Sequence, residues 1–209
     1  MNQQVPSVLS PFRNTYKDYI RAGWRGTIYL PYKEKHPPPT GYIGYRAQYA
    51  DKDKLLEWSK LGQRNIGIRL AGVDKEHELI GIDVDNYKKG NRTKNGGDQL
   101  KELEARLDSL PETWIATSRT DGISGIRFFR VPRGLAFRGQ VEKDIECISK
   151  GIRFAAVWPS VHPEGGIYWW YPPGVLPNEE GHEKWDGKLP NAKELPLLPD
   201  KWIEHLTQN

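Results

Sequence analysis

The feature that most constrains the fold is an apolar stretch that ends in two aspartates, residues 79–85 (LIGIDVD). A short apolar run followed by the turn-forming Asn86 is typical of a buried β-strand. Side chains at positions i and i+2 of a strand project from the same face, so Asp83 and Asp85 are expected to stand side by side. Adjacent carboxylates repel each other unless a cation neutralises them, and Mg²⁺ or Mn²⁺ prefers oxygen ligands. The pair therefore predicts a metal site, although a solvated Asp-rich turn would give the same pattern.

Length and composition limit the class of protein. A chain of 209 residues is long enough for one large domain or two small ones. It has no run of roughly 18 apolar residues, the length that a membrane helix needs. Its first twelve residues lack the charged start and apolar core of a signal peptide. The single cysteine, Cys147, excludes an internal disulfide and argues against a Cys-based zinc site. We expect a cytoplasmic protein with no membrane partner.

The positive charge is concentrated in two blocks. The net charge is +4, but residues 1–50 hold seven Lys and Arg against two acidic residues, and residues 118–153 hold eight against four. Basic blocks on both sides of an acidic motif suggest an anionic substrate brought to a metal, whereas scattered surface charge would give the same counts. Lys35 lies in a proline-rich loop, residues 33–42, that either contacts phosphates or is a rigid connector.

Helices and strands do not alternate regularly along the chain, which favours an α+β fold with a largely antiparallel sheet. Helical spacing or capping predicts helices at 11–23, 51–61 (with Leu55, Leu56 and Trp58 buried), 98–110 and 199–207. Apolar runs predict strands at 26–30, 65–70, 79–84, 114–118, 125–131, 145–148, 152–158 and 166–171. The strands 65–70 and 79–84 are expected to form a hairpin.

Four further stretches carry chemistry. The segment 117–127 (TSRTDGISGIR) combines hydroxyls, glycines and arginines, which suit a cradle for a triphosphate, although an ordinary hairpin loop needs no function. Asp144 and Glu146 would share a face if both lie on a strand, and either would complete an acidic triad of the kind that holds two metal ions in nucleotidyl transfer. Ser160 and His162 follow a strand and either contact phosphate or sugar or form a structural turn. The aromatic run 168–171 (YWWY) either stacks on bases or packs in the core.

Taken in order, these motifs resemble the primase-polymerase (prim-pol) domain of the archaeo-eukaryotic primase superfamily, found at the N-terminus of phage and plasmid replication proteins. The resemblance covers residues 19–171. It rests on six ordered segments: GW-x4-YLPY-x2-K, NIGIRL, GIDVD, TSR-x-DG-x-SGIRFFRVP, IE and VWPS-x-HPEGG-x-YW.

The resemblance implies roles for individual residues. Asp83, Asp85 and Glu146, with Asp144 as the alternative to Glu146, match the acids that are catalytic and hold two Mg²⁺ or Mn²⁺ ions. Arg127 stands where much of the superfamily has a nucleotide-binding His, and as a permanent cation it still suits triphosphate contact. The nucleotide-binding candidates are Ser118, Arg119, Ser124, Arg127, Ser160 and His162, with Lys35 and Arg69 as further possibilities.

The resemblance also implies a fold and a function. The expected fold is an antiparallel, RRM-like catalytic sheet flanked by helices (about 76–171), with an N-terminal α/β subdomain (about 1–75) packed against it and an irregular extension with a short helix (172–209). The expected activity is template-dependent nucleotidyl transfer, as a DNA primase, a DNA polymerase or both, using single-stranded DNA template, primer and dNTPs or NTPs. A helicase usually follows in the same polypeptide; this chain holds no P-loop, so a helicase would lie outside it. The alternatives are a non-catalytic nucleic-acid-binding module of a replication helicase and a metal-dependent nuclease.

Overall fold

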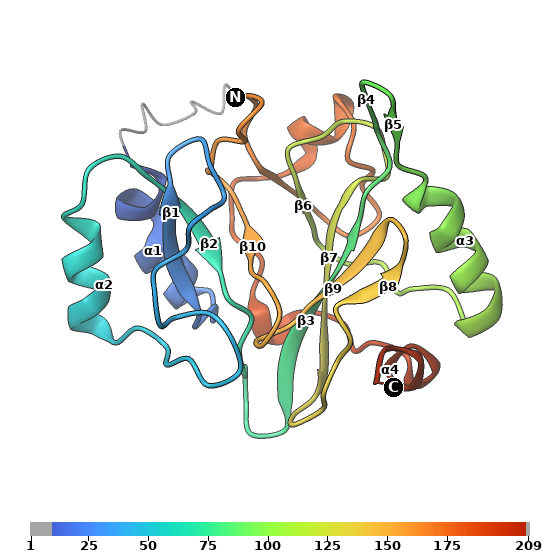
Figure 1. The fold of residues 1–209 in the computed structure, drawn as a ribbon, viewed down its shortest axis with the longest axis horizontal. Helices are drawn as coiled ribbons and strands as arrows, with labels where there is room; N and C mark the ends of the chain where they lie inside the picture. The colour runs from blue at the N-terminus through green and yellow to red at the C-terminus, as the bar shows by residue number, and fades with distance from the viewer. Residues whose placement is uncertain (1–9, 208–209) are drawn as a thin grey trace.

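Two antiparallel sheets that share a core organise the chain, as a computed structural model describes it for residues 10–207 (Figure 1). Residues 1–9 and residues 208–209 lie outside the described part. Residues 1–9 include most of the segment that lacks the features of a signal peptide. The smaller sheet has the order β1 (Thr27–Pro31), β2 (Arg64–Ile68), β10 (Ala155–Ala156). The larger sheet has the order β11 (Trp169–Tyr171), β6 (Ile115–Thr117), β7 (Gly125–Pro132), β3 (His77–Val84), β9 (Ile145–Ile148), β8 (Gln140–Glu142). The strand pairs of both sheets are antiparallel, so the predicted α+β class is confirmed.

Helices cover the outer faces of the two sheets. The helices are α1 (Pro11–Arg21), α2 (Lys52–Ser59), α3 (Gly96–Leu107) and α4 (Asp200–Thr207), with 3-10 turns η1 (Glu180–Lys184) and η2 (Ala192–Glu194). In Figure 1, α1 and α2 lie beside the small sheet, and α3 and α4 lie beside the large one. A small hairpin of β4 (Lys88–Lys89) and β5 (Arg92–Thr93) projects between β3 and α3. Within residues 10–207, no helix has the length and apolar character that crossing a bilayer requires.

Strand β3 separates two layers of core because its side chains alternate between the faces of the large sheet. Ile80, Ile82 and Val84 pack in one core with Leu100 and Leu103 of α3 and with Trp202 and Leu206 of α4. Leu79 packs in the other core, which lies between the two sheets and includes Ile66 of β2 and Phe128 of β7. Asp83 shares the face of Leu79, so the fold directs the first aspartate toward the space between the sheets.

The predicted hairpin of residues 65–70 with 79–84 is wrong. β2 pairs with β1 and β10 in the small sheet, whereas β3 pairs with β7 and β9 in the large one. Both strands are buried on both faces, so each needs its own covering layers, and the short connection carries the chain from one sheet to the other. The prediction that Leu56 is buried is also wrong, because it is 47% exposed on α2.

The C-terminal segment is part of the packed structure. Trp185, Ala192 and Leu195 join the core between the sheets, and Trp202 of α4 joins the other core. The predicted terminal helix at 199–207 corresponds to α4. The subdomain boundary near residue 75 stays a prediction; β10, at residues 155–156, supplies the third strand of the sheet that β1 and β2 form.

Candidate active site

A pocket of about 460 Å³ opens between the two sheets. Strands β3, β6, β7 and β9 contribute one wall, and the opposite wall includes β10 and the loop that carries Lys35. Its polar lining consists of Lys35, His36, Asp83, Asp85, Tyr87, Thr117, Ser118, Arg119, Ser124, Arg153, His162 and Tyr168. The pocket thus brings together two carboxylates, several basic side chains and a set of hydroxyls.

The three predicted catalytic acids lie close together on β3 and β9. Asp83 pairs directly with Glu146 across these strands, and Asp85 follows the end of β3. Burial, together with the neighbouring Asp85 and Glu146 charges, raises the pKa of Asp83 to about 6, while Lys35 and Arg127 oppose the rise. Asp83 therefore sits where its own negative charge is unfavourable unless a cation is near.

The acids fit a divalent metal in part. Asp83 and Asp85 both line the pocket and supply the hard oxygen donors that Mg²⁺ and Mn²⁺ prefer. Glu146 instead forms an ion pair with Arg153, with its Oε2 2.9 Å from Nη1. Among residues 10–207, no three His, Cys, Asp or Glu side chains are grouped closely enough to ligate one ion. Asp83 and Asp85 are therefore the acids that could hold a metal in the pocket, whereas Glu146 is paired with Arg153 and does not line it.

The backbone of Asp85 is held on both sides. Its N–H donates to the carbonyl of Asp144 (3.0 Å), and its carbonyl accepts from the N–H of Gly96 (2.8 Å) at the start of α3. A Cβ atom on Gly96 would lie 2.5 Å from the Asp85 carbonyl oxygen, so only glycine allows this approach. These contacts fix the second aspartate although it lies beyond the strand.

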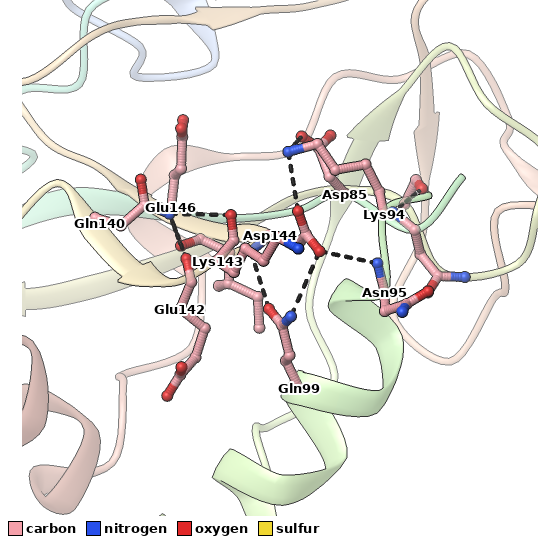
Figure 2. Close-up of polar contacts among 12 residues, drawn as sticks. Asp85, Lys94, Asn95, Gln99, Gln140, Glu142, Lys143, Asp144 and Glu146 are labelled. Carbon is pink, nitrogen blue, oxygen red and sulfur yellow. Dashed lines mark hydrogen bonds and ion pairs between the residues drawn. The ribbon is translucent and has the colours of Figure 1, made fainter. Parts of the chain in front are cut away.

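Asp144 does not share a strand face with Glu146. It lies in the turn between β8 and β9, because β9 begins at Ile145. Figure 2 shows its carboxylate turned toward the start of α3, where Oδ2 accepts from the N–H of Asn95 (3.0 Å) and from the Gln99 amide (3.4 Å), and Oδ1 lies 3.0 Å from Lys94 Nζ. Burial raises the pKa of Asp144, but the Asn95 N–H and the Lys94 ammonium outweigh it and leave the pKa lowered. The structure thus places Asp144 as an anchor for α3, outside the pocket.

The loop between β6 and β7 brings Ser118, Arg119 and Ser124 to the pocket. The Arg119 guanidinium lies 3.5 Å from the ring centroid of Tyr87, and its Nη2 lies 3.5 Å from Oε2 of Glu164. The hydroxyl of Ser124 accepts from the backbone N–H of Asn86 (2.8 Å), which ties the loop to the end of β3.

Arg127 is not brought into the pocket. It pairs with Ile82, so it starts from the sheet face that α3 covers, opposite the face of Asp83. Its guanidinium donates to the carbonyls of Gly125 (3.1 Å) and Ile123 (2.7 Å). The sequence motif alone could not reveal this, because a strand's facing depends on its register with β3.

His162 and Lys35 line the pocket near Tyr168. Burial and the charges of Lys35 and Arg119 lower the pKa of His162, which keeps the imidazole neutral at pH 7. Its Nδ1 accepts from the backbone N–H of Glu164 (3.1 Å), so the proton of the neutral ring is on Nε2. His162 therefore offers a neutral N–H donor beside two cations.

Two other candidates have structural partners outside the pocket. Ser160 is fully buried, and its hydroxyl bonds both the N–H (2.8 Å) and the carbonyl (2.7 Å) of Ile66 in β2. Arg69 is 2% exposed and donates to backbone carbonyls of Gly44, Ala47, Gln48 and Lys150.

Sequence reasoning missed Arg153 and Tyr87 as site residues. Tyr87 had a usable signal, because it lies two residues beyond Asp85 in the same turn. Arg153 had none, since its pairing with Glu146 depends on the turn between β9 and β10.

Comparison with known protein families gives a match over most of the chain. Residues 16–184 match the model of the Prim-Pol family, which is described as the N-terminal domain of bifunctional DNA primase/polymerase. No curated protein and no solved structure matches the chain. The matched range contains every residue that lines the pocket.

Proposed function

Because the chain belongs to the Prim-Pol family of bifunctional DNA primase/polymerase N-terminal domains, we propose that it is a template-dependent nucleotidyltransferase that makes primers, extends DNA, or does both. The observation that carries the proposal is the pocket between the sheets, where Asp83 and Asp85 meet a wall that carries Lys35, Arg119 and His162. An anionic substrate that needs a divalent cation would use both groups of side chains.

The substrate we propose is a nucleoside triphosphate, either dNTP or NTP. Arg119 offers a planar fork of donors, Lys35 a point charge and His162 a neutral Nε2–H, and together they suit phosphate oxygens. Ser118 and Ser124 add hydroxyls at the edge of the loop between β6 and β7. In the reaction, the 3′-oxygen of the primer or first nucleotide bonds to the α-phosphorus, and the bond to pyrophosphate breaks.

The cofactor we propose is two Mg²⁺ or Mn²⁺ ions, held by Asp83 and Asp85 with Glu146 as the third acid. When bound, these ions would activate the attacking hydroxyl and stabilise charge on the leaving group. The raised pKa of Asp83 supports this role, because a carboxylate that is unfavourable alone becomes favourable beside a cation.

The template we propose is single-stranded DNA that passes the hairpin of β4 and β5. Lys89 of this hairpin pairs with Glu164, and Lys94 pairs with Asp144, while Lys88 and Arg92 form no ion pair within the described residues. Both are exposed, next to the wall that holds Tyr87. Exposed cations on this hairpin suit contact with phosphates of the nucleic-acid backbone.

The RRM-like description of the large sheet, a place in phage or plasmid DNA replication, an attached helicase and a cytoplasmic location belong to the same proposal. The first three rest on the family resemblance, and the cytoplasmic location rests on the composition of the sequence.

The experiment that tests the proposal is synthesis on circular single-stranded DNA with Mg²⁺ or Mn²⁺, with and without a primer, and with NTPs or dNTPs. We expect metal-dependent products, and unprimed reactions show whether the chain primes. Shortened template in the presence of metal and the absence of nucleotides would favour the nuclease. DNA binding with no product in any reaction would favour the non-catalytic module.

A further inference from the structure

Arg153 is the one basic residue of the pocket whose side chain is paired with a predicted metal-binding acid in the described structure. Its Nη1 lies 2.9 Å from Oε2 of Glu146, and Arg153 also lines the pocket that contains Asp83 and Asp85. The guanidinium therefore sits between the third acid and the space that we assign to the substrate.

The backbone of Arg153 is strained. Its φ of 65° is in the left-handed region, which costs free energy for any residue with a Cβ atom. The turn before it fixes this conformation: Ser149 and Ile152 exchange backbone hydrogen bonds (3.1 and 3.0 Å), and the carbonyl of Lys150 accepts from Arg69 Nε (2.8 Å). Glycine would adopt this backbone conformation at a lower cost in free energy. The presence of arginine at position 153 is therefore explained by its side chain and not by its backbone conformation.

The ion pair between Arg153 and Glu146 is not explained by a contribution to fold stability. The Arg153 side chain is 60% exposed, and ion pairs at that exposure contribute little to folding. What the pair does is neutralise Glu146, which lies directly opposite Asp83 and would otherwise add a third negative charge to the cluster. Arg153 thus neutralises the charge of Glu146, as a divalent cation would do.

We propose that Arg153 changes partner when substrate binds: its guanidinium releases Glu146 to the metal and binds phosphate oxygens of the nucleoside triphosphate. The inference rests on the proposed function. It follows from the position of Arg153, which reaches both Glu146 and the pocket, and from the guanidinium fork, which matches a phosphate as well as a carboxylate. Arg153 then supplies the permanent cation that Arg127, on the other face of the sheet, does not bring to the pocket.

The test measures binding rather than turnover, with the 209-residue chain and no nucleic acid. Mn²⁺ binding is followed by the loss of the free-ion electron paramagnetic resonance signal, and binding of dATP with Mg²⁺ by calorimetry. Arg153→Gln keeps a Cβ atom, and hence the backbone cost, but removes the charge. Arg106→Gln is the matched control, because Arg106 of α3 is likewise an exposed partner of a glutamate, Glu142, and does not line the pocket.

We expect Arg153→Gln to bind Mn²⁺ about threefold more tightly than the parent, because Glu146 is free, and to bind dATP with Mg²⁺ about tenfold more weakly. Arg153→Lys keeps the charge without the fork, so its Mn²⁺ affinity should stay near that of the parent while its dATP affinity falls. If Arg153→Gln does not fold, Arg153→Lys still tests the second effect.

The failures can be told apart. A parent protein that binds both ligands, with Arg153→Gln indistinguishable from Arg106→Gln, would overturn the exchange and leave the proposed function intact. Weaker binding of Mn²⁺ by Arg153→Gln would also overturn the proposed exchange, because that result would show that Arg153 stabilises the metal site. A folded parent that binds neither Mn²⁺ nor dATP would overturn the proposed function as well.

Discussion

Asp83 of β3 and Glu146 of β9 lie directly opposite each other on adjacent antiparallel strands. Like charges in that position destabilise a sheet. The other face of the same strand pair is fully apolar, because Ile82 and Val84 pack with Ile145 and Cys147. Burial of the apolar face thus stabilises this strand pair and offsets the repulsion between the two acids on the opposite face. Such a conflict is expected where side chains serve a site rather than stability.

The first prediction is that Asp83→Asn stabilises the metal-free protein while abolishing synthesis. The pKa of Asp83 is raised from 3.8 to about 6, so the folded state prefers the protonated carboxyl. That preference contributes fully below pH 3.8 and is lost as the pH rises through about 6. At pH 8 the asparagine should therefore raise the free energy of unfolding by about 1 to 3 kcal/mol, and at pH 4 it should have little effect.

Urea denaturation with a metal chelator at pH 8 and pH 4 measures this difference. Asp98→Asn is the control, because Asp98 is exposed on α3. An Asp83→Asn protein that is less stable than the parent at pH 8 would mean that the carboxylate is already compensated without metal.

The second prediction separates Asp144 from the catalytic acids. Asp144→Ala removes the bonds to Asn95, Gln99 and Lys94 that hold the start of α3, so the free energy of unfolding should fall by about 2 to 4 kcal/mol at pH 7. Because the pKa of Asp144 is lowered, this contribution is present above the ordinary pKa of 3.8 and is lost as the pH falls below it. The difference between the two proteins should therefore shrink in acid.

Chemical denaturation across pH 3 to 7 measures this effect, with Glu142→Ala as a surface control in the same hairpin. Synthesis per folded molecule should stay near that of the parent. A stable Asp144→Ala protein that has lost synthesis would instead make Asp144 the third acid.

The third prediction concerns Arg69. It is buried and donates to carbonyls of the loop before α2 and of the turn after β9, so Arg69→Met should cost about 3 kcal/mol of stability. Arg64→Met, at the start of β2, should change stability by far less, because the one backbone carbonyl that Arg64 bonds belongs to its neighbour Gln63. Thermal unfolding of both variants checks this. Equal losses of stability in the two variants would show that the hydrogen bonds of Arg69 do not stabilise the loop before α2.

The fourth prediction concerns His162. Burial and the Lys35 and Arg119 charges lower its pKa, so the imidazole should titrate below pH 6.5. A bound triphosphate would offset both cations and raise that pKa. Nuclear magnetic resonance of the His162 ring, assigned with His162→Gln, measures both values. A midpoint at or above 6.5 in the free protein, or no change with dATP, would contradict the placement of His162 beside the phosphates.

Local patterns predicted local structure well. The two-residue period of a strand placed Asp83 on one face, and capping by Asp51, whose side chain accepts from the N–H of Lys54, marked the start of α2. Pairing between distant segments was beyond those patterns. The hairpin of 65–70 with 79–84 was wrong because the two strands join different sheets, and strand β8 was missed.

The candidate site was also predictable from local patterns, but not where it depends on pairing between distant segments. The D-x-D pair and the 117–127 loop meet in one pocket, as motif chemistry indicates, although their roles stay predictions. Arg127 and Ser160 lie outside it because register and burial decide where a side chain points. Arg153 reaches Glu146 through a left-handed turn residue that no periodicity reveals.

The most direct test of the central claim is incorporation of α-labelled dNTPs into a primed single-stranded template, comparing the parent with Asp85→Asn and with Asp98→Asn. Asp85 lines the pocket, and Asp98 is an exposed acid on α3 that does not. We predict that incorporation falls about a hundredfold or more in Asp85→Asn and stays at the parent level in Asp98→Asn, with all three proteins equally folded. Parent-level incorporation by Asp85→Asn would contradict the assignment of nucleotidyl transfer to this pocket.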